Sequence, residues 1–208
     1  MLKFAFLIPL LNLIPVFTGL NVFLRLKSNK SILFSYYLII TATCGMICLF
    51  LALNGKNNHW CYNCLQIIIF ILAGLIFYVE FQKKLILYIT ICVTLFLIVN
   101  TFIVGFCNFN QLNFNIIFTS FGIISGVCIK NYMLKSIKEK YDKYSFWMYC
   151  GFFVFSFGTI FPNLFFSIVL NKTSELIFVF YSIYQFVLNL IVNLIFVKSV
   201  NLIKNDKF

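Results

Sequence analysis

Long apolar stretches alternate along the chain with short segments in which polar and charged residues gather. Each stretch is about 20 residues long, which is the length at which an α-helix crosses a hydrocarbon core of about 30 Å. The pattern predicts an all-α integral membrane protein, a bundle of seven transmembrane helices that forms a single domain over residues 1–208. The expected spans are residues 4–23, 31–53, 60–78, 85–106, 113–132, 146–170 and 176–197.

The composition supports a membrane location. Hydrophobic residues make up 62% of the 208 residues and charged residues only 10%, whereas soluble domains carry about 25% charged residues. The formal net charge is +11. In a soluble domain such a charge favours nucleic acid, but here the loops carry no aromatic interleaving or domain that reads a base, so we expect no nucleic-acid partner.

The basic residues lie on alternate loops. Most of the 16 Lys and Arg residues follow the first, third, fifth and seventh spans: Arg25, Lys27, Lys30, Lys83, Lys84, Lys130, Lys135, Lys138, Lys140, Lys143, Lys198, Lys204 and Lys207. Short cytoplasmic loops are enriched in Lys and Arg. The distribution predicts an outside N-terminus and a cytoplasmic C-terminus, and we expect the protein in a bacterial inner (plasma) membrane.

The last two spans each carry a polar face. Their side chains recur at steps of three, four and four residues and so share one face of each helix: Ser156, Thr159, Asn163 and Ser167, then Ser182, Gln185, Asn189 and Asn193. A short turn predicts that the two helices are antiparallel. The expected pairs are Ser167 with Ser182, Asn163 with Gln185, Thr159 with Asn189, and Ser156 with Asn193.

Two interpretations of these faces remain open. The groups can join the helices through interhelical hydrogen bonds, or they can line a cavity for a small neutral ligand, because amides both donate and accept without burying a charge. The second interpretation adds Asn12, Asn63, Gln66 and Asn100. Pro162 favours it slightly, since a proline within a span frees a carbonyl.

Gly122 and Gly126 form a Gly-x-x-x-Gly pattern in the fifth span. This spacing lets another helix approach closely. Packing within the chain is the preferred interpretation, and a homodimer through these two glycines is the alternative.

Groups that perform chemistry are scarce at mid-membrane depth. The five acidic residues lie at or beyond the ends of the predicted spans, and His59 is the only histidine. Ion-coupled transport relies on ionisable groups within the membrane, and acid–base or nucleophilic catalysis needs an activated pair. We expect neither, and we expect no cofactor.

The segment "GKNNHWCYNC" leaves a second question open. His59, Cys61 and Cys64 could bind a metal ion, but outside the cytoplasm such thiols also oxidise to a disulfide. A disulfide between Cys61 and Cys64, or from one of them to Cys107, is the preferred interpretation over a metal site.

At "KNNHWCYN", "SFWMYCGFFVFSFGTIF" and "VLNLIVNLIF" the chain resembles a loose group of small, largely uncharacterised bacterial proteins with seven membrane helices. The resemblance implies a sensor-type membrane module without a specified ligand. We therefore expect a non-catalytic sensor or accessory subunit that contacts the lipid bilayer and acts through a membrane or cytoplasmic protein partner. The alternatives are a carrier for a small neutral solute, using a polar cavity between the sixth and seventh spans, and a purely structural scaffold.

Overall fold

A computed structural model of the chain describes residues 7–25, 28–108, 110–135, 143–169 and 175–202. These residues form seven α-helices and no strand, which confirms the all-α prediction for the part of the chain described. The helices are α2 (Leu7–Arg25), α3 (Asn29–Leu53), α4 (His59–Phe81), α5 (Lys84–Val104), α6 (Gln111–Lys135), α7 (Lys143–Val169) and α8 (Glu175–Leu202).

Six of these helices, α3 to α8, are long and apolar enough to cross a membrane. In α2 the corresponding apolar segment, Leu11–Leu24, is shorter, because only part of the first predicted span belongs to the residues described with their side chains. The structure therefore indicates an integral membrane protein with several spans. The total of seven spans and the orientation of the termini stay predictions.

The helices divide into two compact units. Unit 1 comprises residues 1–117 and contains α2 to α5 with the first turns of α6. Unit 2 comprises residues 118–208 and contains the rest of α6 with α7 and α8. The prediction of a single domain remains a prediction.

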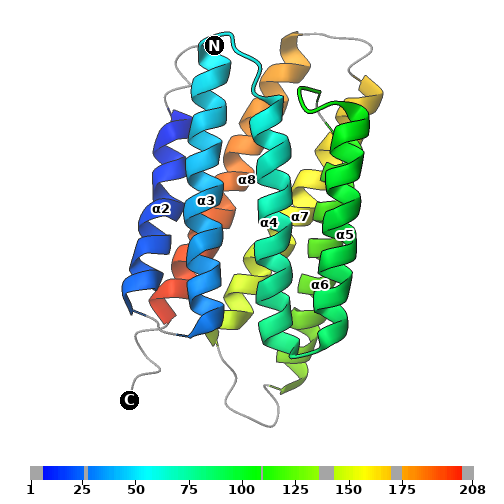
Figure 1. The fold of residues 1–208 in the computed structure, drawn as a ribbon. Coiled ribbons are helices and arrows are strands. Elements are labelled where there is room, and N and C mark those ends of the chain that lie inside the picture. Colours follow the sequence, from blue (N-terminus) through cyan, green and yellow to red (C-terminus); the bar gives the residue numbers. More distant parts are fainter. Residues whose placement is uncertain (1–6, 26–27, 109, 136–142, 170–174, 203–208) are drawn as a thin grey trace. The chain divides into compact units, whose positions relative to one another are not determined.

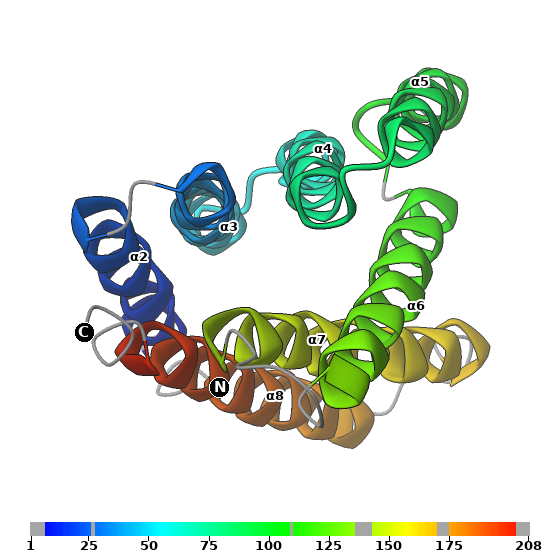
Figure 2. The same cartoon turned by 90° about the horizontal axis from the view of Figure 1, so that it is seen from below.

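In unit 1 the helices α2 to α5 follow one another side by side, each antiparallel to the one before (Figures 1 and 2). Glycine allows close approach at two of the contacts. The position of a Cβ on Gly19 would overlap Ile39 of α3, and a Cβ on Gly74 of α4 would overlap Thr90 of α5. Each helix satisfies its own backbone hydrogen bonds, as a hydrocarbon solvent requires. Side-chain packing and side-chain hydrogen bonds, such as the one from the Ser35 hydroxyl to the carbonyl of Gly19, therefore set these approaches.

In unit 2 the helices α7 and α8 lie side by side and antiparallel (Figure 2). Phe196 packs on Gly151. Seven residues later in α7 and eight residues earlier in α8, Leu188 packs on Gly158. The hydroxyl of Tyr184 donates to the carbonyl of Gly158 at 2.8 Å. This direction of pairing is the one expected from the short turn between the two spans.

The two glycines of α6 also pack within unit 2. A Cβ on Gly122 would overlap the ring of Phe157, and one on Gly126 would lie 3.2 Å from the ring of Phe153. Both rings belong to α7. The Gly-x-x-x-Gly pattern thus serves packing within the chain, and these contacts give no support to a homodimer through the same residues.

The exposed faces of the helices are largely apolar. In α5 the buried residues are Thr90, Leu97 and Thr101, whereas Phe102 and Ile103 are 71% and 77% exposed. A soluble protein rarely exposes apolar surface of this extent, and a helix in lipid does so routinely. We conclude that these faces contact the bilayer.

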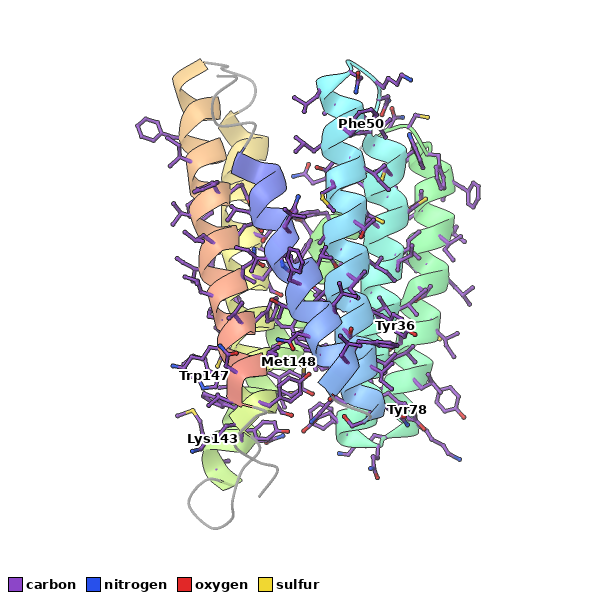
Figure 3. The ribbon with its side chains drawn as sticks, turned by 90° about the vertical axis from the view of Figure 1, so that its left-hand side faces the viewer. Tyr36, Phe50, Tyr78, Lys143, Trp147 and Met148 are labelled. Carbon is purple, nitrogen blue, oxygen red and sulfur yellow. The ribbon has the colours of Figure 1, made fainter. Side chains whose placement is uncertain are left out.

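Bulky side chains mark both ends of unit 1. Phe50 of α3 and Tyr78 of α4 lie at opposite ends of the unit (Figure 3). Trp60, near the end marked by Phe50, and Tyr36, near the end marked by Tyr78, are exposed. Amphipathic rings at two levels are typical of the two membrane interfaces.

Helix α8 continues five residues beyond the predicted end of its span, to Leu202. The apolar pattern stops at Lys198, but in the structure the ammonium of this residue lies 3.7 Å from the centre of the Trp147 ring of α7, a cation–π contact. The next residue, Ser199, is buried and donates to the carbonyl of Tyr144 at 2.9 Å. Figure 3 labels Trp147, the residue of α7 on which the Lys198 ammonium packs. Packing on α7 therefore extends the helix past the polar residue.

Candidate functional site

A group of amide side chains lies at one end of unit 1, where the α3–α4 and α5–α6 connections meet. We call Asn63, Gln66, Asn100, Asn110 and Asn113 the amide cluster. The two connections contact each other directly, because Asn57 donates to the carbonyl of Cys107 at 2.9 Å. Helix α4 begins, and α5 ends, at this end of the unit.

The start of α6 fixes two members of the cluster. The side-chain oxygen of Asn110 accepts a hydrogen bond from the backbone N–H of Asn113 at 3.1 Å. Asn110 directly precedes the helix, so this bond caps the helix N-terminus and satisfies one of its free N–H groups. The cap holds Asn113 in the first turn of α6, on the side of α5.

Asn113 joins α6 to α5. Its amide nitrogen donates to the carbonyl of Leu97 and to the hydroxyl of Thr101, both at 2.9 Å. Its amide oxygen accepts from the side-chain nitrogen of Asn100 at 2.8 Å. This nitrogen of Asn100 also donates to the side-chain oxygen of Asn110 at 3.0 Å. Asn113 is 1% exposed, so these bonds replace contacts with water that the residue has lost.

Asn63 connects α4 to the α5–α6 connection. Its amide nitrogen donates to the carbonyls of Phe106 and Asn108 at 2.9 and 2.8 Å. Gln66 lies three residues further along α4, on the same helix face. Both side chains are more than nine-tenths buried.

Three buried atoms of the amide cluster have no hydrogen-bond partner among the described residues. They are the side-chain oxygens of Asn63 and Gln66 and the side-chain nitrogen of Asn110. Burying a polar group without a partner costs about 1–3 kcal/mol. Two acceptors and one donor of the cluster therefore keep a capacity for hydrogen bonding that the described residues do not use.

On α4 the members of the cluster lie within the first eight residues of the helix. Gln66 lies seven residues after His59, the first residue of the helix, which corresponds to about 10 Å at 1.5 Å per residue. Beyond Gln66 the buried residues of α4 carry no polar side chain: Ile69, Phe70, Ala73, Gly74, Ile76 and Phe77. On this helix the polar surface thus ends about one third of the way across.

The predicted polar faces of spans six and seven lie on α7 and α8. Ser156, Thr159 and Asn193 are buried, and Gln185 and Asn189 are half-buried. Asn163, Ser167 and Ser182 lie outside the residues described with their side chains, and so does Pro162. Whether these faces line a cavity stays a prediction.

Two of the described members bond to their own helix. Thr159 donates to the carbonyl of Phe155, and Asn189 donates to the carbonyl of Gln185 at 2.8 Å. Bonds of this kind satisfy a polar group without joining two helices. The hydroxyl of Ser156, which is fully buried, has no partner among the described residues.

Two other candidate residues of unit 1, Asn12 and His59, make contacts outside the amide cluster. Asn12 of α2 faces α3, because its amide nitrogen lies 3.6 Å from the position of a Cβ on Gly45. His59 begins α4, and its backbone N–H donates to the side chain of Asn57. The part of the chain that the structure describes contains no group of three or more His, Cys, Asp or Glu side chains able to hold a metal ion.

All eight cysteines are free thiols. The thiol of Cys61 points to α3, where it contacts the carbonyl of Cys44 at 3.9 Å and the thiol of Cys48. Cys107 is exposed in the α5–α6 connection. The structure therefore contains neither of the two predicted disulfides, and it gives Cys61 a neighbour on α3, Cys48.

Sequence reasoning also missed Asn110 and Asn113. The fifth span was expected to begin at Asn113, with Asn110 just before it, and neither amide was assigned a role. One signal was available, because an asparagine three residues before another polar residue at a helix start is typical of an N-cap. No local signal connects this turn to residue 63, which lies 45 residues before its partner Asn108.

The chain matches no known protein-family model, no curated protein and no solved structure.

Proposed function

We propose that this multi-pass membrane protein is a non-catalytic, sensor-like or accessory subunit that binds a small neutral ligand at the amide cluster and acts through a protein partner. The observation that carries the proposal is the set of three unpartnered, buried polar atoms of Asn63, Gln66 and Asn110. An uncharged amide site favours an uncharged ligand, because a charged one would lose its hydration without gaining a counter-ion.

The depth of the cluster supports sensing rather than transport. A carrier needs polar surface along the path of its solute, whereas the buried face of α4 beyond Gln66 is apolar. A ligand that enters from the near end therefore meets hydrogen-bonding groups only in the first third of this helix. Binding without passage is what a receptor-type module requires.

The cluster lies at the less basic end of unit 1, which supports an external ligand. Lys83 and Lys84 lie at the opposite end, where Lys30 and Glu80 form an ion pair at 2.9 Å. Cytoplasmic ends are the basic ones. We propose that the amide cluster faces outward, with the N-terminus outside and the C-terminus in the cytoplasm of a bacterial cell.

Cysteine labelling tests this orientation. In a variant that keeps only Cys107, which is exposed beside the cluster, a membrane-impermeant maleimide should label intact cells. Labelling that appears only after the membrane is broken would overturn the orientation and place the ligand on the cytoplasmic side.

Replacement of Gln66 by leucine tests the ligand. Because the Gln66 oxygen has no partner, a purely structural role predicts that Gln66→Leu stabilises the protein and changes nothing else. The proposal predicts in addition that small molecules retained by the protein in mild detergent, identified by mass spectrometry, are lost in the variant. Gln185→Leu is the matched control, since Gln185 also has an unpartnered amide nitrogen but lies in unit 2. Equal retention by both variants would refute a site at the amide cluster.

Co-purification tests the role of a partner. The protein should leave native membranes in mild detergent, at its natural expression level, together with a stoichiometric companion. A protein that is consistently recovered alone would contradict the accessory role and leave a carrier or a scaffold as the alternative.

A further inference from the structure

Four cysteines of unit 1 lie on the facing sides of two neighbouring helices. Cys44 and Cys48 are one turn apart on α3, and Cys61 and Cys64 are one turn apart on α4. The Cys61 thiol points to α3, where it lies 3.9 Å from the carbonyl oxygen of Cys44 and next to the thiol of Cys48. Residues i and i+3 or i+4 of a helix lie on the same face, so this is one group of thiols and not a chance contact.

The antiparallel course of the two helices arranges the thiols in two levels. Cys48 is near the end of α3 and Cys61 near the start of α4, so these two form the level closer to the α3–α4 connection. Cys44 and Cys64 lie one turn deeper. The outer pair is buried, with Cys48 at 0% and Cys61 at 6% exposure.

We propose that Cys48 and Cys61 are a reversible dithiol site, which an external disulfide oxidises to a disulfide bond between α3 and α4. This pairing differs from both disulfides that the sequence suggests, because the Cys61 thiol points to α3. It does not rest on the proposed ligand, since Cys61 and Asn63 make their contacts with different elements.

The reaction is a two-step thiol–disulfide exchange. The thiolate of Cys61, the more accessible of the two, attacks one sulfur of the external disulfide, forming a mixed disulfide and releasing one thiolate. The thiolate of Cys48 then attacks the sulfur of Cys61, forms the Cys48–Cys61 bond and releases the second thiolate. The two protons lost by the cysteines pass to the two released thiolates, so one protein dithiol and one disulfide yield one protein disulfide and two thiols.

The surroundings suit this reaction. The two thiols lie next to each other on facing helices, and their sulfurs must close to a bond of about 2.05 Å. The connection between the two helices, Asn54 to Asn58, is held by its own contacts, including a bond from Asn58 to the carbonyl of Cys48 at 3.1 Å. In the proposed orientation this end faces the outside, where disulfides persist.

Lysines divide the chain so that peptide mapping can distinguish the possible pairs. Trypsin cleavage at Lys30, Lys56, Lys83, Lys84 and Lys130 divides the cysteines among three peptides. Cys44 and Cys48 lie in residues 31–56, Cys61 and Cys64 in residues 57–83, and Cys92, Cys107 and Cys128 in residues 85–130. The purified, folded protein is treated with 4,4′-dithiodipyridine as the external disulfide. Remaining thiols are then blocked with N-ethylmaleimide before digestion, and the peptides are identified by mass spectrometry.

We expect peptides 31–56 and 57–83 to be recovered as one disulfide-linked species that dithiothreitol separates. Cys48→Ser should reduce this species at least tenfold, whereas Cys44→Ser and the control Cys92→Ser, which changes an exposed cysteine of α5, should leave it unchanged. Helical circular dichroism and gel filtration show whether each variant is folded.

Three results would overturn the proposal. A bond within peptide 57–83 would assign the pair to Cys61 and Cys64, and a link to peptide 85–130 would place the partner among Cys92, Cys107 and Cys128. Stable thiopyridine adducts without any linked peptides would show that the thiols react separately.

Discussion

Replacing Asn113 by leucine should measure how strongly the amide cluster holds α6 to α5. The side chain of Asn113 makes three hydrogen bonds to α5, to the carbonyl of Leu97, the hydroxyl of Thr101 and the amide of Asn100. All three are lost in the variant. The backbone N–H of residue 113 keeps its bond to Asn110, so the helix cap survives.

The magnitude follows from the number of bonds. Interhelical hydrogen bonds in membrane proteins contribute about 0.6 kcal/mol on average and about 1.7 kcal/mol at most. Three of them predict a loss of about 2 kcal/mol in the free energy of unfolding, with an upper bound of about 5 kcal/mol. A loss of about 2 kcal/mol lowers the equilibrium constant for folding about 30-fold.

The assay is reversible unfolding of the purified protein in mixed micelles of a mild and a denaturing detergent, followed by circular dichroism. Asn189→Leu is the matched control. The amide of Asn189 donates to the carbonyl of Gln185 in its own helix, so its replacement breaks no bond between helices and should cost less than about 0.5 kcal/mol. The reasoning would be refuted if Asn113→Leu cost no more than Asn189→Leu.

Three further predictions concern unit 1 and use the same assay. Gly74→Ala should destabilise by about 1–3 kcal/mol, because its Cβ would overlap a threonine of α5, whereas Gly45→Ala, whose Cβ has room, should not; equal effects would contradict the packing of α4 on α5. Asn110→Ala should cost about 1 kcal/mol more than Asn110→Gly, because both variants lose the bond from Asn100 but glycine is the better N-cap of α6; a larger loss for glycine would argue against a capping role. Glu80→Gln removes the partly exposed ion pair with Lys30 and should cost at most about 1 kcal/mol at low ionic strength, less as salt is added; a cost independent of salt would count against an electrostatic contribution.

The sequence by itself determined the secondary structure and the class of protein. In a hydrocarbon solvent every backbone N–H and C=O must bond within its own segment, so a long apolar stretch has little choice but helix. For this reason the predicted spans and the observed helices coincide within a few residues at most ends. The largest difference among the described ends is at α8, because the polar residue Lys198 was expected to follow the end of the span. In the structure the helix continues to Leu202, and the ammonium of Lys198 packs on the ring of Trp147 in α7.

Only the tertiary structure decided which polar groups meet. The bond from Asn63 to Asn108 joins residues 45 positions apart, and the neighbour of Cys61 is Cys48, on the preceding helix. Periodicity assigns a side chain to a face of its own helix, but its partner depends on how closely the helices approach. That approach is set by particular residues, such as Gly74 against Thr90, because lipid offers no hydrophobic driving force between helices and leaves the choice of neighbours to shape and hydrogen bonding.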